Sequence, residues 1–312
     1  MNKAKTSNHQ GIALLTVVFL TALAALTLAS FNLSQRGALQ NASSSDAASR
    51  AWSILTLLEH EAIALLKKDR LESSIDTENE EWSQYQFRLN PLLAEFKQAE
   101  FHAQLNDEQA KINLNNLMLN GQLDEVTAAT LKQLLLNLQL PVTLLDGIID
   151  WLDTDSETIS ENGAEDAFYS RLEPPYLTAN SAITDISELR LIRGFNDQIY
   201  AQLSPYLSAL PEHTAINLNT AKSVVMTSLD KSATQTSAFE QDILQQSNTI
   251  VSEFINETAV EKNNMQTVVQ NSSYFRLQSK ITVNNYTLSV DSLITRQSDE
   301  DIRIIQRAMS YD

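Results

Sequence analysis

The longest uninterrupted hydrophobic segment lies at the start of the chain. No residue between Ile12 and Gln35 is charged, and Lys3 and Lys5 are the only charges before this segment. A helix rising ~1.5 Å per residue spans the ~30 Å hydrocarbon layer of a membrane with a segment of this length. An ordinary secretory signal has an apolar core of only ~7–15 residues, followed by a cleavage site. The pattern therefore predicts a transmembrane helix over residues 12–35 that stays on the mature protein.

The helical pattern continues beyond the apolar segment and becomes amphipathic. Apolar residues recur three and four positions apart at Ala48, Ala51, Trp52, Leu55, Leu58, Ala62, Leu65 and Leu66. This spacing is typical of a half-buried helix. Gly37 costs ~1 kcal/mol relative to Ala, which does not end a long helix. We therefore predict one helix of roughly 55–60 residues, half in lipid and half packed on a globular domain, before a polar loop from Glu72 to Glu81.

Strand-like alternation occurs in two distant parts of the chain. The candidate strands are residues 99–105, 110–114, 274–283, 286–296 and 302–309. Asn284-Asn285 between two of them is a two-residue hairpin signal. These segments predict a small antiparallel sheet whose two halves are separated by a long insertion. Together with the long helix, they predict an α+β fold interrupted by an inserted domain.

The insertion carries helical patterns and one internal repeat. Ile112-Asn-Leu-Asn115 recurs as Ile216-Asn-Leu-Asn219, each copy preceding a helical stretch that an Asn or Thr side chain is placed to cap. Two copies fall short of a solenoid, which needs at least three. The expected helices cover residues 124–138, 141–151, 187–193 and 197–207, and weaker helical patterns continue over 223–270.

Composition and charge narrow the functional classes. The chain has no Cys, which excludes a disulfide framework, an iron–sulfur cluster and a thiol nucleophile. Its first 36 residues carry three basic residues and no acid, so the formal charge of −17 leaves −20 for the rest. Basic residues stay on the cytoplasmic side of a first membrane helix, so the acidic body is expected outside. Such a body repels nucleic acid and favours basic partners or cations.

Motifs of catalysis and of phosphate binding are absent from the sequence. The six glycines lie at least 16 positions apart, so no phosphate-cradling loop or dinucleotide fingerprint exists. The four His residues lack metal-ligand spacing, and no Ser lies in a nucleophile elbow. Arg193-Gly194-Phe195 resembles the turn of helix-hairpin-helix DNA-binding modules, but a single Gly in an acidic body indicates a packing unit. We therefore predict that the protein is not an enzyme and does not bind nucleic acid.

One acidic segment is the strongest candidate site. Eight acids and a single base, Arg171, lie between Asp150 and Glu173. Such a density of carboxylates is costly unless a cation neutralises it, and Ca2+ takes six to eight oxygen ligands. Asp153, Asp155 and Glu157 alternate like the start of an EF-hand loop, but Thr158 and Ala164 occupy the positions of its Gly and its last Glu. This is therefore not an EF-hand, and a solvated acidic loop remains the alternative.

The N-terminal segment resembles the class III leader of type IV pilins and of the pseudopilins of type II secretion. That resemblance implies cleavage after Gly11 by a prepilin peptidase and methylation of Ile12 as the first mature residue. Thr16 then stands at the fifth mature position, where most of these proteins carry Glu. The lack of this Glu is typical of the K type, a large minor pseudopilin thought to sit at the tip of the pseudopilus.

The helical insertion strengthens the resemblance, because K-type pseudopilins are similar in having a pilin sheet interrupted by a large all-helical domain. The resembling stretches are residues 107–116, 148–155, 164–169, 174–176, 186–194, 216–221 and the C-terminal strands. The resemblance implies a calcium-binding loop in which later acids complete the ion's shell. The expected metal ligands are Asp153, Asp155, Glu157, Glu165 and Asp166.

The resemblance also implies an organisation and a function. The expected parts are a leader (1–11), a transmembrane helix (12–35), a pilin-like α/β domain (36–110 and 271–312) and an inserted helical domain (111–270). The expected function is a minor pseudopilin that initiates or caps the pseudopilus tip with the I and J types. Its body would lie in the periplasm on a single inner-membrane helix. The alternative is a periplasmic enzyme or receptor domain on an uncleaved anchor.

Overall fold

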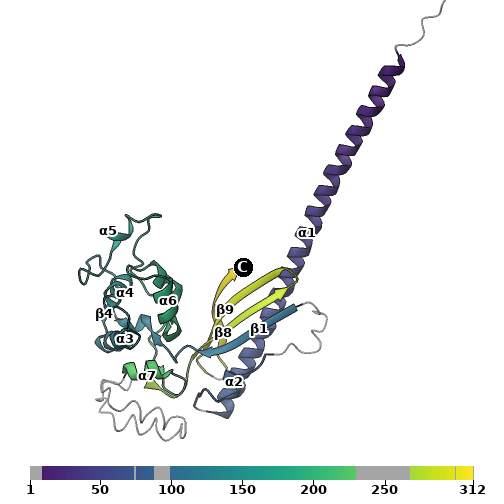
Figure 1. The fold of residues 1–312 in the computed structure, drawn as a ribbon. Helices are drawn as coiled ribbons and strands as arrows, with labels where there is room; N and C mark the ends of the chain where they lie inside the picture. The colour runs from purple at the N-terminus through teal and green to yellow at the C-terminus, as the bar shows by residue number, and fades with distance from the viewer. Residues whose placement is uncertain (1–8, 74, 88–98, 230–267, 299, 312) are drawn as a thin grey trace, which may run out of the picture.

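One helix dominates the molecule. The computed structural model describes residues 9–73, 75–87, 99–229, 268–298 and 300–311. Helix α1 runs without a break over His9–Glu72, 64 residues, and its N-terminal half extends far beyond the rest of the protein (Figure 1). The prediction of one long helix is confirmed. A short helix, α2 (Glu81–Gln84), begins at the last residue of the segment expected to be a loop.

A four-stranded antiparallel sheet packs beside the C-terminal half of α1. Its strands are β1 (Ala99–Asp107), β8 (Tyr274–Val283), β9 (Tyr286–Arg296) and β10 (Ile302–Tyr311), in the order β1-β8-β9-β10. The predicted hairpin is confirmed, since β8 and β9 pair with Val283 opposite Tyr286. Asn284 in its turn has a φ of 55°, which Asn tolerates better than most residues.

The first hydrophobic core joins α1 to this sheet. From the helix it takes the buried residues Ala47, Ala51, Ile54, Leu55, Leu58, Ala62, Leu65 and Leu66, and from the sheet Leu105, Phe275, Leu277, Ile281, Val283, Leu288, Val290 and Ile294. An ion pair to a buried carboxylate adds a specific contact, because the guanidinium of the half-exposed Arg307 on β10 donates to both carboxylate oxygens of Glu59 at 2.7 and 2.9 Å. Helix and sheet are therefore one packed unit.

The prediction that residues 110–114 belong to this sheet is wrong. Ile112–Asn113 forms a short strand, β2, that pairs in parallel with β5 (Leu207–Ser208) in the inserted region. The apolar alternation was too short to specify a partner, and the partner lies almost a hundred residues away. The chain therefore leaves the sheet directly after Asp107.

The inserted region has a second core of its own and gathers on the side of the sheet opposite α1 (Figure 1). Among its described residues the helices are α3 (Glu125–Asn137), α4 (Leu144–Leu152), α5 (Asp166–Tyr169), α6 (Asp197–Leu203) and α7 (Ser223–Leu229). The same described part contains the 3-10 helices η2 (Leu114–Leu117), η3 (Ile186–Leu191) and η4 (Ser204–Tyr206). Short strands complete it: β3 (Met118–Leu119), β4 (Gln122–Leu123), β6 (Ile216–Asn217) and β7 (Val268–Val269). Most of the weak helical pattern over 223–270 lies outside the described residues.

The two copies of the Ile-Asn-Leu-Asn motif adopt the same local structure. Each Ile-Asn pair forms a short parallel strand pair, β2 with β5 and β6 with β7. In each copy the Asn side chain accepts a hydrogen bond from the backbone two residues later, from Asn115 N to Asn113 Oδ1 at 3.2 Å and from Asn219 N to Asn217 Oδ1 at 3.0 Å. In the first copy Asn113 is the N-cap of η2, as expected, whereas in the second copy the turn at Asn217 precedes α7, which begins only at Ser223.

Candidate functional site

The apolar half of α1 is the first candidate functional surface. Leu14–Asn32 has a mean hydropathy of 2.3 over 19 residues, and none of it is buried against the protein. Its polar side chains bond to the helix itself, since Thr21, Thr27 and Ser30 donate to carbonyl oxygens one turn earlier. Because these groups are satisfied within the helix, the segment suits a hydrocarbon environment.

The predicted processing residues lie just before this apolar segment. Gly11 and Ile12 fall within the backbone of α1, at its first turn. The side chain of Ile12 lies outside the described residues. Cleavage after Gly11 and methylation of Ile12 therefore stay predictions.

Three carboxylates of the acidic segment converge at the end of α4. Asp150 belongs to the last turn of that helix, Asp153 is its C-terminal cap, and Glu165 is the N-terminal cap of α5. One carboxylate oxygen from each lies within 4.8 Å of the others. Gly163 makes room for Asp150, because a Cβ on Gly163 would lie 1.9 Å from Asp150 Oδ2. The loop between α4 and α5 thus folds its carboxylates toward one point.

The oxygens at this point have no hydrogen-bond donors among the described residues. Asp150 Oδ2, Asp153 Oδ1 and both carboxylate oxygens of Glu165 are buried and unpartnered. Burial, reinforced by the neighbouring carboxylates, raises the pKa of Asp153 to about 6 and that of Glu165 to about 7. Buried oxygens of Thr178 and Asn180 are likewise unpartnered. Since a buried polar group without a partner is costly, this all-oxygen set fits a hard cation such as Ca2+.

The structure separates the predicted ligands into two sets. Asp153 and Glu165 lie in the convergent group, whereas the exposed Asp155 and Glu157 are not part of it. Asp155 Oδ1 accepts the backbone N–H of Glu157, and Asp166 Oδ1 accepts that of Thr178. Sequence reasoning gave no ligand role to Asp150. Its position three residues before Asp153, near the end of a helix, is the signal that places both at one helix terminus.

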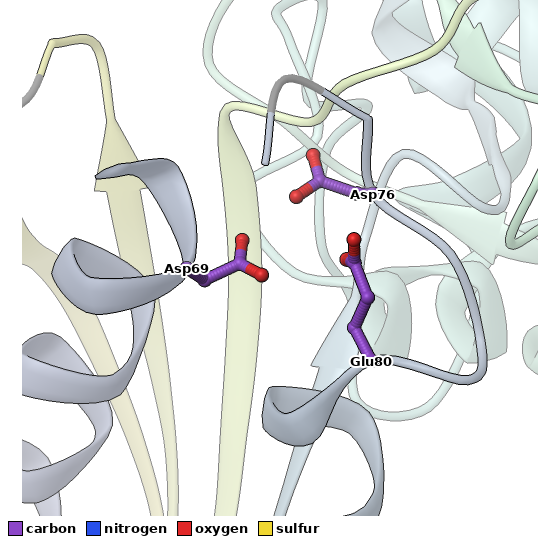
Figure 2. Close-up of side chains that lie close together, drawn as sticks. All are labelled: Asp69, Asp76 and Glu80. Atoms are coloured by element: carbon purple, nitrogen blue, oxygen red, sulfur yellow. The ribbon is translucent and has the colours of Figure 1, made fainter. Parts of the chain in front are cut away.

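A second group of acids lies at the end of α1, and Figure 2 shows Asp69, Asp76 and Glu80 facing one another. Its environment is different, because Arg296 at the end of β9 supplies donors. Arg296 Nη1 lies 2.8 Å from Asp69 Oδ2, and Nη2 donates to both oxygens of Asp76. Glu80 accepts from Thr77 N at 3.0 Å and from the Trp82 indole N–H at 2.8 Å. These three carboxylates therefore have hydrogen-bond donors from the protein, unlike the oxygens that meet at the end of α4.

Comparison with known proteins identifies relatives. Residues 110–212 match a family described as "Type II secretion system (T2SS), protein K". The chain is 36% identical over 228 residues to Type II secretion system protein K of Klebsiella pneumoniae, covering 68% of this chain and 67% of that protein. It is 25% identical over 326 residues to the protein of the same name from Pseudomonas aeruginosa, covering 96% and 93% of the two chains.

A solved structure has the same fold. One chain of the crystal structure titled as the GspK-GspI-GspJ complex from enterotoxigenic Escherichia coli Type 2 Secretion System matches with a TM-score of 0.69. The match covers 86% of this chain and 98% of that chain at 23% sequence identity. That chain therefore shares the fold of most of this protein.

Proposed function

This chain belongs to the type II secretion system protein K family, and on that premise we propose that it is a minor pseudopilin. It would enter the inner membrane as a precursor, lose residues 1–11 to a prepilin peptidase, and be methylated at Ile12. Its body would lie in the periplasm, where it would start and cap the pseudopilus tip together with minor pseudopilins of the I and J types. The function rests on protein contacts and includes no catalysis.

The observation that carries this proposal is the unequal covering of α1. The apolar residues on one face of α1 between Ala47 and Leu66 are buried against the chain's own sheet. The apolar segment Leu14–Asn32 is bare of any covering among the described residues. A single rigid helix thus presents one half to its own domain and leaves the other half for lipid or for helices of other subunits. That division is what a fibre subunit extracted from a membrane requires.

The processing step is tested by Gly11→Val, with Gly37→Val as the matched control. A peptidase pocket that fits only Gly should reject the branched side chain at Gly11, so the precursor should keep Lys3 and Lys5. The control places the same side chain outside the cleavage site and should be processed. The measurement is the N-terminal residue by mass spectrometry. Mature protein beginning at Ile12 from the Gly11→Val variant would refute the proposal.

The assembly step is tested by purifying the mature full-length protein in detergent with and without its I-type and J-type partners. We expect a discrete complex with both partners and no polymer of this chain alone. The inserted region gathers on one side of the sheet and would block addition of a further subunit above it (Figure 1). Long homopolymers formed without partners would contradict a capping role.

We further propose that Ca2+ binds at the carboxylate group of Asp150, Asp153 and Glu165. The support is the set of buried oxygens without donors, since a divalent cation would satisfy them together. Carbonyl or side-chain oxygens near Thr178 and Asn180 would add to the shell. The predicted roles of Asp155, Glu157 and Asp166 as ligands are kept as proposals, with weaker support because none of them is in the convergent group.

The calcium proposal is tested by thermal unfolding with and without a chelator. At ~100-fold excess over its dissociation constant, Ca2+ adds ~2.7 kcal/mol to the stability of the state that binds it. Asp153→Asn should remove this stabilisation, whereas Glu161→Gln, an exposed acid in the same loop, should retain it. Mg2+ should restore the loss poorly, because it demands a smaller octahedral shell. Identical melting curves of the wild type with and without chelator would contradict calcium binding and would support the alternative of a solvated acidic loop.

The alternative of an enzyme or receptor domain on an uncleaved anchor has no specific observation in its favour. Recovery of the wild-type protein with residues 1–11 still attached would support it. The same N-terminal measurement therefore separates the two functions.

A further inference from the structure

Arg193 bonds to the backbone of the acidic loop and not to its acids. Its Nη1 donates to the carbonyl oxygens of Glu161 at 3.2 Å and of Gly163 at 2.8 Å. Eight acids lie between Asp150 and Glu173, yet Arg193 forms no ion pair with any carboxylate in the part of the chain that the structure describes. A guanidinium that binds two carbonyls in an acidic loop fixes the path of the backbone there.

The position of Arg193 is itself fixed by the two helices that flank the loop. Its backbone N–H donates to the hydroxyl of the buried Tyr169 on α5 at 3.2 Å. Its carbonyl oxygen packs against Gly147 of α4, where an added Cβ would lie 3.4 Å away. Its guanidinium carbon lies 5.0 Å from the centre of the Phe168 ring, an arrangement that attracts a cation. The turn at Arg193 is therefore a firm support from which the side chain reaches the loop.

The hydrogen bond to Gly163 affects the orientation of Asp150. In a planar trans peptide, the carbonyl of one residue and the N–H of the next point in opposite directions. Because Arg193 holds the Gly163 carbonyl, the N–H of Ala164 points away from Arg193. The backbone N–H groups of Ile159 and Ala164 bond to the Asp150 carboxylate, and they oppose the rise in its pKa that burial causes. Arg193 thus helps to orient Asp150 without touching it.

The hydrogen bond to Glu161 ties the loop to the start of α4 by the same geometry. With the Glu161 carbonyl turned toward Arg193, the N–H of Asn162 donates to Ser160 Oγ at 3.0 Å. The Ser160 hydroxyl in turn donates to Asp146 Oδ2, in the first turn of α4, at 2.6 Å. The two carbonyls bound by Arg193 therefore set two successive parts of the loop.

The three convergent carboxylates need such a support. One oxygen from each lies within 4.8 Å of the others, and like charges at this separation repel one another. A loop without support would open and let the carboxylates separate, so that a cation would have to order the loop as it binds. Glu165 lies on the short stretch between Gly163 and Phe168, both of which Arg193 contacts.

We infer that Arg193 is a positioning residue of the calcium site. By holding two backbone carbonyls, it keeps the loop in the conformation in which the carboxylates of Asp150, Asp153 and Glu165 meet. The inference rests on the calcium binding proposed above. Arg193 raises the affinity for Ca2+ because the loop is ordered before the ion arrives, which lowers the entropic cost of binding. The Arg193-Gly194 turn, which the sequence indicated to be a packing unit, thereby gains a specific role.

The positive charge of Arg193 and its hydrogen bonds have opposite effects on the affinity. A positive charge near a cation site repels Ca2+, so removal of the charge alone should strengthen binding. Removal of the bonds to the carbonyls should weaken binding, because the loop is then less ordered. Loss of a residue that orients metal ligands typically lowers metal affinity by about 10–100-fold. The sign of the change therefore separates positioning from charge.

The test is the Kd of Ca2+, measured by calorimetry on the full-length protein in detergent. Arg193→Met removes the donors and keeps an apolar side chain over Phe168, and it should raise the Kd about 10–100-fold. Arg193→Lys should keep most of the affinity, because both carbonyls accept from one atom and an ammonium can donate to both. Arg171→Met is the matched control. It removes an exposed base of the same acidic segment and should leave the Kd unchanged or lower it.

A second measurement needs no variant, in case Arg193→Met does not fold. In the wild type with chelator, the backbone amides of residues 159–164 should stay protected from hydrogen exchange, because Arg193 orders the loop without the ion. The inference is overturned by an unchanged Kd in a folded Arg193→Met variant, by equal losses in the Met and Lys variants, or by free exchange of these amides in chelator. A wild-type protein that binds no Ca2+ would instead refute the calcium proposal, and this inference with it.

Discussion

Substituting Gly163 by Ala is the sharpest probe of the carboxylate group. The added Cβ would lie 1.9 Å from Asp150 Oδ2, whereas an ordinary contact needs at least 3.4 Å. The Asp150 carboxyl must therefore move by about 1.5 Å, and overpacking of this kind costs ~1–3 kcal/mol. A movement of that size takes one oxygen away from the point where the three carboxylates meet. If Ca2+ binds there, the variant should lose its ~2.7 kcal/mol contribution as well.

The assay is thermal unfolding of the full-length protein in detergent, with saturating Ca2+ and with a chelator. In the wild type, the calcium contribution corresponds to a rise of about 5–10 °C in melting temperature for a domain of this size. Gly163→Ala should melt lower and show little response to Ca2+. Gly147→Ala is the matched control, because its Cβ would meet Ile192 Cγ2 at 3.1 Å and no carboxylate. A full calcium response in Gly163→Ala would refute the assignment of Asp150 to the site.

Two further predictions concern how α1 is held to the sheet. Leu58→Ala should destabilise the protein by about 2–5 kcal/mol because Leu58 is fully buried, whereas Leu57→Ala, at 41% exposure, should cost far less; denaturant titration measures both. Arg307→Ala leaves the buried carboxylate of Glu59 without its guanidinium, which should cost about 1–3 kcal/mol. Arg303→Ala removes only an exposed partner of Asp301 and should cost at most about 0.5 kcal/mol in the same titration, so equal losses in the two Arg variants would contradict the importance of the guanidinium for the buried Glu59.

Local patterns were enough to predict the elements whose partners are near in sequence. The stripe through Leu55 and Leu58 specified the covered half of α1, and Asn284-Asn285 specified the β8–β9 hairpin, because both depend on residues a few positions apart. The segment around Ile112 shows where prediction from local patterns fails. Its two-residue strand pairs with Leu207–Ser208, and nothing within the segment indicates so distant a partner.

The same limit applies to the candidate metal site. The sequence shows that acids are dense between Asp150 and Glu173, but not which of them face inward. That depends on α4 ending at Leu152, on the missing side chain of Gly163, and on the start of α5 at Asp166. Asp150 lies within the predicted helix over residues 141–151, and its convergence with Asp153 and Glu165 depends on contacts in space that the sequence does not show.

The adjacent ends of the insertion have a consequence for the order in which the chain folds. Strand β1 cannot pair with β8 until 166 intervening residues (108–273) have been made, and closing so long a loop is slow and entropically costly. If the insertion folds first, its own core brings Glu108 beside Tyr274 and leaves a gap equivalent to a few residues. Shortening the loop in this way lowers its closure cost by about 3 kcal/mol. We therefore expect the insertion to fold before the sheet. The inserted region would then bring β1 and β8 together, and so would promote the folding of the sheet that it interrupts in sequence.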